Sequence, residues 1–436
     1  MAFYELDEKP LNRLLAYITL LVGLGTFLDG YDLLNISVAL PFLMKFMKAT
    51  AAIQGVLGTA TYVGGIFGAL LFGAFSDLRG RKPALIVDLV FFFIASILSA
   101  FVSSVAQLIA LRLAIGFGIG ADIVSGPALL SEMLPRSRRG TMLGLSLLMM
   151  PLGGLASALV AYILYSLRVP ADLIWRAVFA LGAVPALIVV LLRSRILESP
   201  RWVAKFGDPK KHKKEFSVFG IAKQEAAKRS YSEIFRSYRK ALAYSSIAWF
   251  SAGTTSMLTI FTPMILERFA TKGYPQMLSL TLVAWTSALA GAAISAILHD
   301  YVGRKRMAMA SILLLGASYI LLGLSLRLSA YALESSLSAA MFFAFMNVSA
   351  AYVIQTEVFP TEAKSFADGL AFSLNRVANF LFGSIVPVLL VSGLLAGFML
   401  ISGTIVIILG SAIAFLGIET KKKSLEAIER ELMSQI

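Results

Sequence analysis

The sequence predicts an all-α membrane protein of twelve transmembrane helices in two pseudo-symmetric bundles of six. Three observations support this fold class: apolar runs long enough to cross a bilayer recur along the chain, basic residues gather in alternate connections, and the first half repeats in the second. Of the 436 residues, 58% are hydrophobic and 15% are charged. Soluble globular domains are nearer half apolar and a quarter charged, so the composition excludes a soluble protein.

The apolar runs have the length that a membrane helix requires, which is about 20 residues. Six runs lie in the first half of the chain and six in the second. The first set covers roughly 14–40, 52–75, 84–103, 106–133, 141–167 and 174–193, and the second covers roughly 241–266, 276–299, 307–327, 331–356, 366–392 and 394–417.

Lysine and arginine are concentrated in the connections after the second, fourth, sixth and eighth runs and in the C-terminal tail. Connections of this kind face the cytoplasm, so both termini are expected there, and the cell (plasma) membrane is the expected location. The net charge of +14 would suit a nucleic-acid partner. However, the basic residues lie in loops and form no stripe on a soluble domain, so we expect no nucleic-acid binding.

Charge and hydropathy together divide the chain into four parts. These are an N-terminal six-helix bundle (1–193), a basic cytoplasmic linker with short amphipathic helices (194–240), a C-terminal six-helix bundle (241–418) and a cytoplasmic tail (419–436). The chain has no cysteine, and its two histidines are isolated, so no metal site is expected. No phosphate-binding glycine-rich loop occurs, so the sequence does not support a process that is driven by ATP hydrolysis.

Three short motifs occur twice, at almost the same offset. The pairs are Asp77–Lys82 with Asp300–Lys305, 223 residues apart; Glu132–Pro135 with Glu357–Pro360, 225 apart; and Glu198–Arg201 with Glu419–Lys421, 221 apart. A common offset for three pairs indicates a duplicated six-helix unit. Transporters are commonly built from such repeats, with the substrate near the bilayer midplane between them.

These motifs resemble those of the major facilitator superfamily over essentially the whole chain. Gly73-x-x-x-Asp77-x-x-Gly80-Arg81-Lys82 and Arg112-x-x-x-Gly116-x-Gly118-x-Gly120 are similar to its general signatures. Glu198-Ser-Pro-Arg201-Trp202, Phe359-Pro360-Thr361-Glu362 and Glu419-Thr-Lys421 look like the signatures of its sugar-porter branch. The resemblance implies a secondary transporter whose two bundles rock about a central cavity.

Two further motifs are similar to those of phosphate and aromatic-acid proton symporters. They are Asp29-Gly30-Tyr31-Asp32 in the first run and Gly118-Ile-Gly120-Ala121-Asp122 in the fourth. The glutamines of a sugar site are missing from the fifth and seventh runs, and Gly253 stands where a phosphate site has an aspartate. The sequence therefore fits neither a sugar site nor a phosphate site well.

Proton coupling is expected at Asp29, Asp32, Arg112 and Asp122, because ionisable side chains inside a span are costly and usually functional. Asp32 lies roughly 12 Å and Arg112 roughly 9 Å below the outer ends of their runs, so the two side chains should meet. Losing this contact would let the carboxylate take up a proton, and the resemblance also assigns the pair to proton coupling. The alternatives are a static ion pair and, for Asp29 and Asp122, carboxylates satisfied by nearby hydroxyls. We expect these groups to share one cavity with Arg376.

Substrate binding is expected at Arg376, which lies near mid-membrane in the eleventh run beside Asn375 and Asn379. An arginine there can bind an anionic substrate through two hydrogen bonds or pair with Asp29. The further candidates for substrate contact, for which packing is the alternative, are Tyr62, Trp249, Thr254, Asn347 and Gln355.

A cytoplasmic gate is expected at the charged motif residues. They are Asp77, Gly80, Arg81, Glu132 and Arg139 in the first half and Asp300, Gly303, Arg304, Glu357 and Lys364 in the second. Charge networks there can hold the inner side shut while the outer side is open. The alternative is a role in topology alone, since the same residues satisfy the positive-inside rule.

These expectations combine into one function: a proton-coupled symporter of a small organic anion or metabolite that works by alternating access. A proton-coupled sugar transporter is the first alternative, and a non-transporting membrane sensor with a transporter fold is the second. An enzyme is not expected, because no nucleophile–base or metal constellation appears. The expected partners are a small-molecule substrate, protons and the lipid bilayer. The protein is expected to be a monomer that uses the proton gradient and no cofactor.

Overall fold

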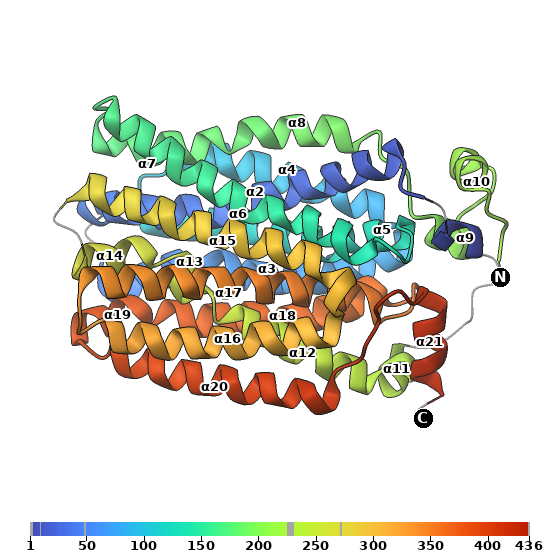
Figure 1. Ribbon diagram of the computed structural model, residues 1–436. Helices are drawn as coiled ribbons and strands as arrows, with labels where there is room; N and C mark the ends of the chain where they lie inside the picture. Colours follow the sequence, from blue (N-terminus) through green and yellow to red (C-terminus); the bar gives the residue numbers. More distant parts are fainter. Residues whose placement is uncertain (1–2, 9, 48, 225–230, 271–272, 435–436) are drawn as a thin grey trace.

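The computed structural model describes residues 3–8, 10–47, 49–224, 231–270 and 273–434, and all regular structure in these ranges is helical. The fold class that the sequence predicts is confirmed. The long helices run side by side along the molecule, with the first half above the second in Figure 1.

Each half contributes a bundle of long helices, and several are interrupted. The first half contains α2 (Arg13–Met47), α3 (Ala51–Arg79), α4 (Arg81–Ser99), α5 (Val105–Met133), α6 (Arg139–Ser166), and α7 (Ala171–Leu181) followed by α8 (Ala183–Arg193). The second half contains α12 (Arg239–Gly253), α13 (Ser256–Thr259), α14 (Thr262–Phe269), α15 (Tyr274–Val302), α16 (Arg304–Ser325), α17 (Ala330–Glu357), α18 (Lys364–Ser384), α19 (Val386–Ser392) and α20 (Leu395–Leu416). The short helices outside the bundles are α1 (Tyr4–Glu8), α9 (Pro200–Phe206), α10 (Lys213–Phe219), α11 (Tyr231–Ser237) and α21 (Leu425–Met433).

Eleven helices in the described part of the chain are long and apolar enough to cross a membrane. The remaining span, expected at 241–266, is divided into α12, α13 and α14. At Thr254 and Thr255 the backbone N–H groups donate three residues back, to Ser251 and Ala252, instead of four. Interrupted spans of this kind commonly line the substrate site of a transporter.

Local sequence explains where several helices begin and end. The Ser104 hydroxyl accepts from Gln107 N, while Gln107 Oε1 accepts from Ser104 N, so a capping box starts α5. Gly80 ends α3 with φ at +102°, and Gly303 ends α15 with φ at +103°. Only glycine adopts this backbone without strain. The two identical turns at equivalent positions follow from the internal repeat.

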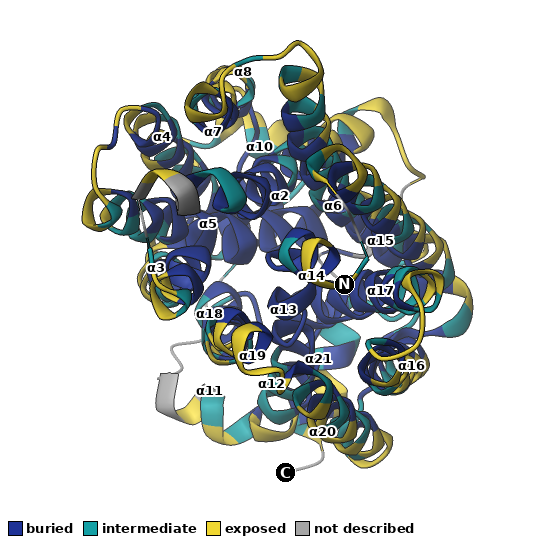
Figure 2. Cartoon of the chain, turned by 90° about the vertical axis from the view of Figure 1, so that its left-hand side faces the viewer, coloured by how far each residue is buried: buried dark blue, intermediate teal, exposed yellow. Residues whose placement is uncertain are grey.

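Two long interfaces join the halves: α3 packs along α18, and α6 packs along α15. In a view along the helices, buried residues fill the centre and exposed residues form the rim (Figure 2). The α3–α18 approach is close, since a Cβ added to Gly73 would lie 2.6 Å from the Ser365 carbonyl oxygen. Small residues commonly allow such close packing in membranes.

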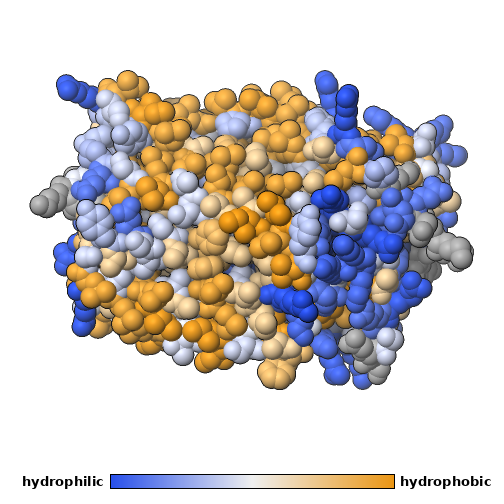
Figure 3. Space-filling view, in the orientation of Figure 1, coloured by the Kyte–Doolittle hydropathy of each residue, from blue (hydrophilic) through white to orange (hydrophobic). Residues whose placement is uncertain are grey.

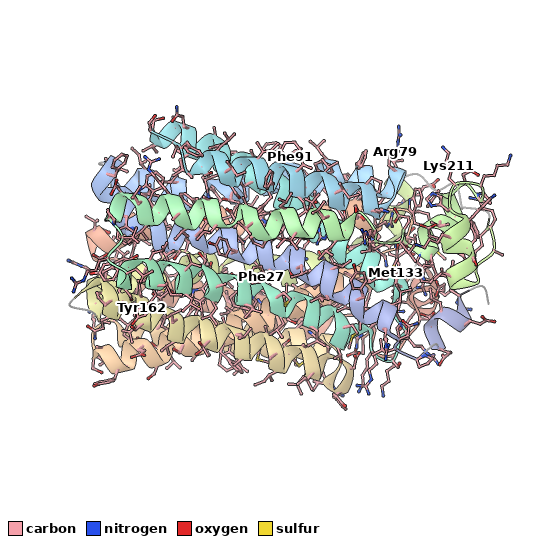
Figure 4. All side chains as sticks on the ribbon, turned by 90° about the horizontal axis from the view of Figure 1, so that it is seen from above. Phe27, Arg79, Phe91, Met133, Tyr162 and Lys211 are labelled. Atoms are coloured by element: carbon pink, nitrogen blue, oxygen red, sulfur yellow. The ribbon has the colours of Figure 1, made fainter. Side chains whose placement is uncertain are left out.

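The surface separates into an apolar belt and one strongly hydrophilic end (Figure 3). We call this end the basic end; it contains α9, α10, α11 and α21 (Figure 1). We call the opposite end the far end. Arg79 and Lys211 lie at the basic end, and Tyr162 lies toward the far end (Figure 4). Large apolar side chains on the belt are well exposed, for example Leu71 at 61% and Phe415 at 83%, as lipid contact requires.

Candidate functional site

A cavity lies between the two halves, near the middle of the helices that line it. Its volume is about 40 Å³, so it has room for ordered water but must widen before a metabolite can enter. Five aromatic side chains dominate its wall, together with the basic side chain of Arg376. The aromatic residues are Tyr62, Trp249, Trp285, Phe345 and Phe372.

Arg376 lies in this wall with only 3% of its surface exposed. Its guanidinium stacks on Phe372, with 4.2 Å from Cζ to the ring centroid, and faces Tyr62 at 5.2 Å. Such contacts stabilise a cation without neutralising it. Nε has no hydrogen-bond partner among the described residues. The described carboxylates form no ion pair with this side chain. Asp29, the alternative partner, interacts with it electrostatically without direct pairing. A buried guanidinium with unused donors is available to an anionic ligand.

The other candidate substrate contacts divide into two groups. Asn375, Asn379, Tyr62 and Trp249 line the cavity with Arg376. The side chains of Thr254, Asn347 and Gln355 do not, because each is bonded elsewhere. Thr254 bonds to Tyr319, Asn347 donates to Ser251, and Gln355 accepts from Trp249 Nε1 and donates to the Ile123 carbonyl.

The structure brings Asp32 and Arg112 together. Arg112 Nη1 donates to Asp32 Oδ2 at 2.9 Å, and Asn35 Nδ2 donates to Asp32 Oδ1 at 3.0 Å. Both members of the ion pair are fully buried. Neither Nε nor Nη2 of Arg112 has a partner among the described residues. Both oxygens of Asp32 thus accept hydrogen bonds, whereas two of the three nitrogens of the Arg112 guanidinium donate none.

Asp122 lies in a second buried charge cluster within the first half. Arg193 of α8 donates to both of its oxygens, at 2.6 and 3.2 Å, and lies 3.5 Å from Asp88 of α4. Asp29 interacts electrostatically with both of these carboxylates. Within the described ranges, Asp29 Oδ2 and Asp88 Oδ1 have no hydrogen-bond partner. Asp29 also interacts electrostatically with Arg376 of the second half. The three carboxylates lie close enough to repel one another, and taking up a proton would relieve this repulsion.

The expectation that one cavity unites Arg376 with the three carboxylates is wrong for this state of the protein. Arg376 lines the cavity, whereas Asp29, Asp32 and Asp122 lie in the packed interior of the first half. The cause is local charge pairing, because Arg112 pairs with Asp32 and Arg193 pairs with Asp122 within the first half. Sequence reasoning overlooked Asp88 and Arg193; the first stands inside an apolar run and the second at the end of one.

The expected gate residues lie at the basic end and repeat the same contacts in both halves. Arg81 pairs with Asp77 at 3.3 Å and with Glu132 at 3.1 Å. In the second half Arg304 pairs with Asp300 at 2.9 Å and with Glu357 at 2.8 Å. The Glu198 carboxylate accepts from the backbone of Arg81, and Glu419 accepts from that of Arg304, both at 3.0 Å. A Cβ on Gly80 or Gly303 would collide with these glutamates, which explains both glycines.

Two of these carboxylates also connect the halves. Asp77 accepts from the backbone N–H groups of Ser365 and Phe366 at the start of α18, at 3.0 and 2.9 Å. Asp300 accepts from those of Gly140 and Thr141 at the start of α6, at 3.3 and 2.8 Å. A carboxylate at a helix N-terminus is stabilised by the free N–H groups and the helix dipole. At the basic end each half therefore supplies a carboxylate that caps a helix of the other half, and these contacts hold the end closed.

The geometry agrees with comparisons to known proteins. A family model described as "Sugar (and other) transporter" matches residues 18–432. The chain belongs to this transporter family. It is therefore a multi-pass membrane protein of the major facilitator superfamily and a transporter, not an enzyme.

Relatives of the transporter differ in what their names say they move. The inner membrane metabolite transport protein YgcS of Escherichia coli K12 is 28% identical over 88% of this chain and 86% of that protein. A probable 4-methylmuconolactone transporter of Cupriavidus pinatubonensis is 29% identical over 81% of this chain and 78% of that protein. Family membership alone thus leaves the substrate open.

A solved structure matches the fold closely. The proton:xylose symporter XylE bound to 6-bromo-6-deoxy-D-glucose gives a TM-score of 0.82 at 21% identity, covering 96% of this chain and 99% of that chain. The inward open conformation of XylE from E. coli gives 0.69. Both matches show the same helical fold.

The transporter's basic end includes residues that sequence reasoning missed. Asp7 of α1 accepts from Arg139 at 2.8 Å and from Arg201 of α9 at 3.0 Å. Arg201 Nε also donates to Glu426 of α21 at 2.9 Å. Burial raises the pKa of Glu426, but the Arg201 guanidinium outweighs it and holds that pKa at about 2. Helices α1 and α21, near the two ends of the described chain, thus bind to the closed gate through ion pairs.

The far end closes by different contacts. The ring of Tyr274 on α15 lies 4.5 Å from that of Phe42 on α2 and 4.9 Å from that of Tyr165 on α6. The Tyr274 hydroxyl also donates to the Val38 carbonyl at 3.4 Å. These rings connect the second half to the first, so the cavity is covered at both ends.

Proposed function

We propose that the protein is a proton-coupled symporter of a small organic anion. In this proposal it is a monomer in the cell membrane with its basic end in the cytoplasm. Two bodies, residues 1–193 and 241–418, rock about the cavity while the linker 194–240 joins them. Protonation of Asp32 or Asp29 from outside precedes substrate binding, and the rocking motion then releases substrate and proton inside.

The observation that supports an anionic substrate is the free guanidinium of Arg376. It stacks between aromatic rings at the cavity wall, is 3% exposed and has no ion pair with the described carboxylates. Burying an unpaired cation is costly, and a carboxylate in the cavity would remove that cost. The aromatic side chains around it favour a substrate with a flat apolar body attached to the acidic group.

A neutral sugar is the runner-up substrate. The loop signatures and the family description favour it, and the amides of Asn375 and Asn379 reach the cavity wall. These amides already bond to each other and to the Trp249 carbonyl. They would have to reorient before they could bind hydroxyl groups.

Ligand binding to Arg376→Ala tests the anion proposal. Thermal shift or uptake is compared across organic acids, phosphate and sugars for the wild type and the variant. We expect affinity for an acid to fall about 10- to 150-fold, since hydrogen bonds to charged groups contribute roughly 1.5–3 kcal/mol, while neutral ligands change little. Arg376→Lys keeps the charge and serves as the matched variant. An equal loss for charged and neutral ligands would refute the proposal.

Uptake by Asp32→Asn tests the coupling. Vesicles with an imposed pH gradient should no longer accumulate substrate, because the amide that replaces the carboxylate can bond to Arg112 but cannot exchange a proton. Substrate exchange without a gradient should continue. Asp172→Asn removes an exposed carboxylate at the start of α7 and is the control. Gradient-driven accumulation at the wild-type level would exclude Asp32 as a required carrier. Ligand binding without any flux in the wild type would favour the sensor alternative.

A further inference from the structure

One buried carboxylate at the gate has no role in the mechanism above. Asp368 lies on α18 with 0% of its surface exposed. Neither Oδ1 nor Oδ2 has a hydrogen-bond partner among the described residues. Among the described carboxylates it thus differs from its neighbours Asp77 and Glu132, which both accept hydrogen bonds.

The position of Asp368 connects the gate to the cavity. It is one helical turn from Lys364, and Arg376 follows roughly 12 Å further along the same helix. The charged groups near it are Lys364 on its own helix, Asp77 on α3, Arg81 on α4 and Glu132 on α5. It therefore lies between the cavity and the basic end, at the interface that must separate when that end opens.

In the closed state Lys364, the cation one turn away on the same helix, attracts Asp368 electrostatically but donates its hydrogen bonds elsewhere. Lys364 Nζ donates to the Thr356 carbonyl at 2.8 Å and lies 3.5 Å from Ser131 Oγ of the first half. An ionised Asp368 would be a buried charge without a hydrogen bond, beside two other carboxylates. Burying an unpaired charge is strongly unfavourable, whereas a protonated, neutral carboxyl group is much less costly to bury.

Opening of the basic end would change these surroundings. Separation of α18 from α3 and α5 breaks the Asp77 cap on Ser365 and Phe366 and the contact of Lys364 with Ser131. Water can then reach Asp368. The Lys364 ammonium keeps its bond to the Thr356 carbonyl of its own half. Its remaining N–H donors can then pair with Asp368 across one turn, since the two residues stand at i and i+4. Ionisation is thus favoured in the open state and opposed in the closed state.

We propose that Asp368 is a proton-binding site of the gate, which holds a proton while the basic end is closed and releases it as that end opens. Asp368 would bind one proton. This proton is distinct from the proton that the coupling mechanism assigns to Asp32 or Asp29. Release toward the cytoplasm rests on the orientation in the proposed function. The carboxylate left behind would repel an anion leaving the cavity and so oppose its return.

Distance measurements across the gate test this site. The chain contains no cysteine, so spin labels can be attached specifically to Arg79→Cys on α3 and Arg306→Cys on α16, two exposed positions on opposite halves. Electron–electron double resonance then gives the closed and open populations in detergent as a function of pH, without substrate. One linked proton makes the open-to-closed ratio rise by up to about tenfold per pH unit.

Variants at Asp368 decide the outcome. Asp368→Asn, which mimics the protonated group, should stay closed at every pH, and Asp368→Glu should restore the pH dependence. Should Asp368→Asn fail to fold, Asp368→Ser must likewise lack the pH dependence. A pH-dependent distance in these neutral variants, or none in the parent, would overturn the proposal.

A parallel variant separates this site from the coupling residues. Asp32→Asn should keep the pH dependence of the gate while it abolishes gradient-driven uptake. Should Asp32→Asn abolish the gate response while Asp368→Asn retains it, the gate site is refuted and the coupling role of Asp32 stands. The opposite failure, in which Asp32→Asn retains coupled uptake, refutes the coupling assignment and leaves Asp368 unaffected.

Discussion

The two ends of the molecule close the same cavity by different physical means. At the basic end, buried arginines pair with carboxylates at 2.8 to 3.3 Å, and carboxylates cap helices of the opposite half. At the far end, the rings of Tyr274, Phe42 and Tyr165 meet at 4.5 and 4.9 Å. One closure is made of charges and the other of aromatic contacts.

This difference determines how each closure can open. A buried ion pair is stable only while both partners are present, since an unpaired buried charge costs several kcal/mol. Partial opening of the basic end is therefore unfavourable until water replaces the lost partners, which favours two discrete states. Aromatic contacts weaken gradually with distance and are independent of protonation. The basic end is thus suited to couple conformation to protons.

The largest expected effect is that of Arg304→Ala at the basic end. The change leaves Glu357 and Asp300 buried without their guanidinium, at a cost of about 3–5 kcal/mol to the closed state. Spin labels on the gate should accordingly report a shift of more than about a hundredfold toward the open distance. Thermal stability should fall as well.

Arg306→Ala is the matched control, because this exposed arginine lies two residues further along α16. Labels for this comparison are placed at Arg79 and at an exposed residue other than Arg306. A gate that stays closed in Arg304→Ala would show that the ionic contacts do not hold the basic end, and the contrast between the two ends would disappear.

A smaller effect is expected from Tyr274→Ala at the far end. Two aromatic pairs are lost, each contributing about 0.5–1.5 kcal/mol. Labels at the exposed residues Leu167 and Leu328 should show a shift to longer distances that is the same at low and high salt and at every pH. Tyr331→Ala, at a position 83% exposed, should leave the distance unchanged. A salt- or pH-dependent shift in Tyr274→Ala would contradict the assignment of the far end as an uncharged closure.

Much of this contrast could be predicted from the sequence. The internal repeat and the spacing of Asp77, Arg81 and Glu132 predict a charged gate, because such residues at the ends of adjacent spans have few other partners. The twelve spans follow from the length of the apolar runs. Equal depth in neighbouring helices also predicts that Asp32 meets Arg112. Their proposed functional roles stay predictions.

The rest depends on information that a linear pattern lacks. Arg193 stands at the end of an apolar run, and only the packing of α8 against α2 and α4 brings it to Asp122. The aromatic closure depends on Tyr274, Phe42 and Tyr165, which lie in three helices and resemble ordinary span residues. The partner of a long side chain depends on its rotamer and on the rotation of its helix. The membrane depth inferred from the sequence can therefore suggest possible partners but cannot choose among them.

The smallest expected effect concerns the periphery of the basic end, where charge pairing meets water. The Glu426 side chain is 41% exposed, so solvent screens its contact with Arg201, and Glu426→Gln should cost under about 1 kcal/mol. The ordinary pKa of 4.5 falls to about 2 in the folded protein, so the ionised form is favoured by folding. This contribution is complete above about pH 4.5 and is lost as the pH falls toward 2. Thermal unfolding should therefore separate Glu426→Gln from wild type by a small, constant margin at pH 5 to 7, and the margin should shrink below that range. A margin as large as that of Arg304→Ala would mean that the ionic closure extends to the tail and is not confined to the buried arginines.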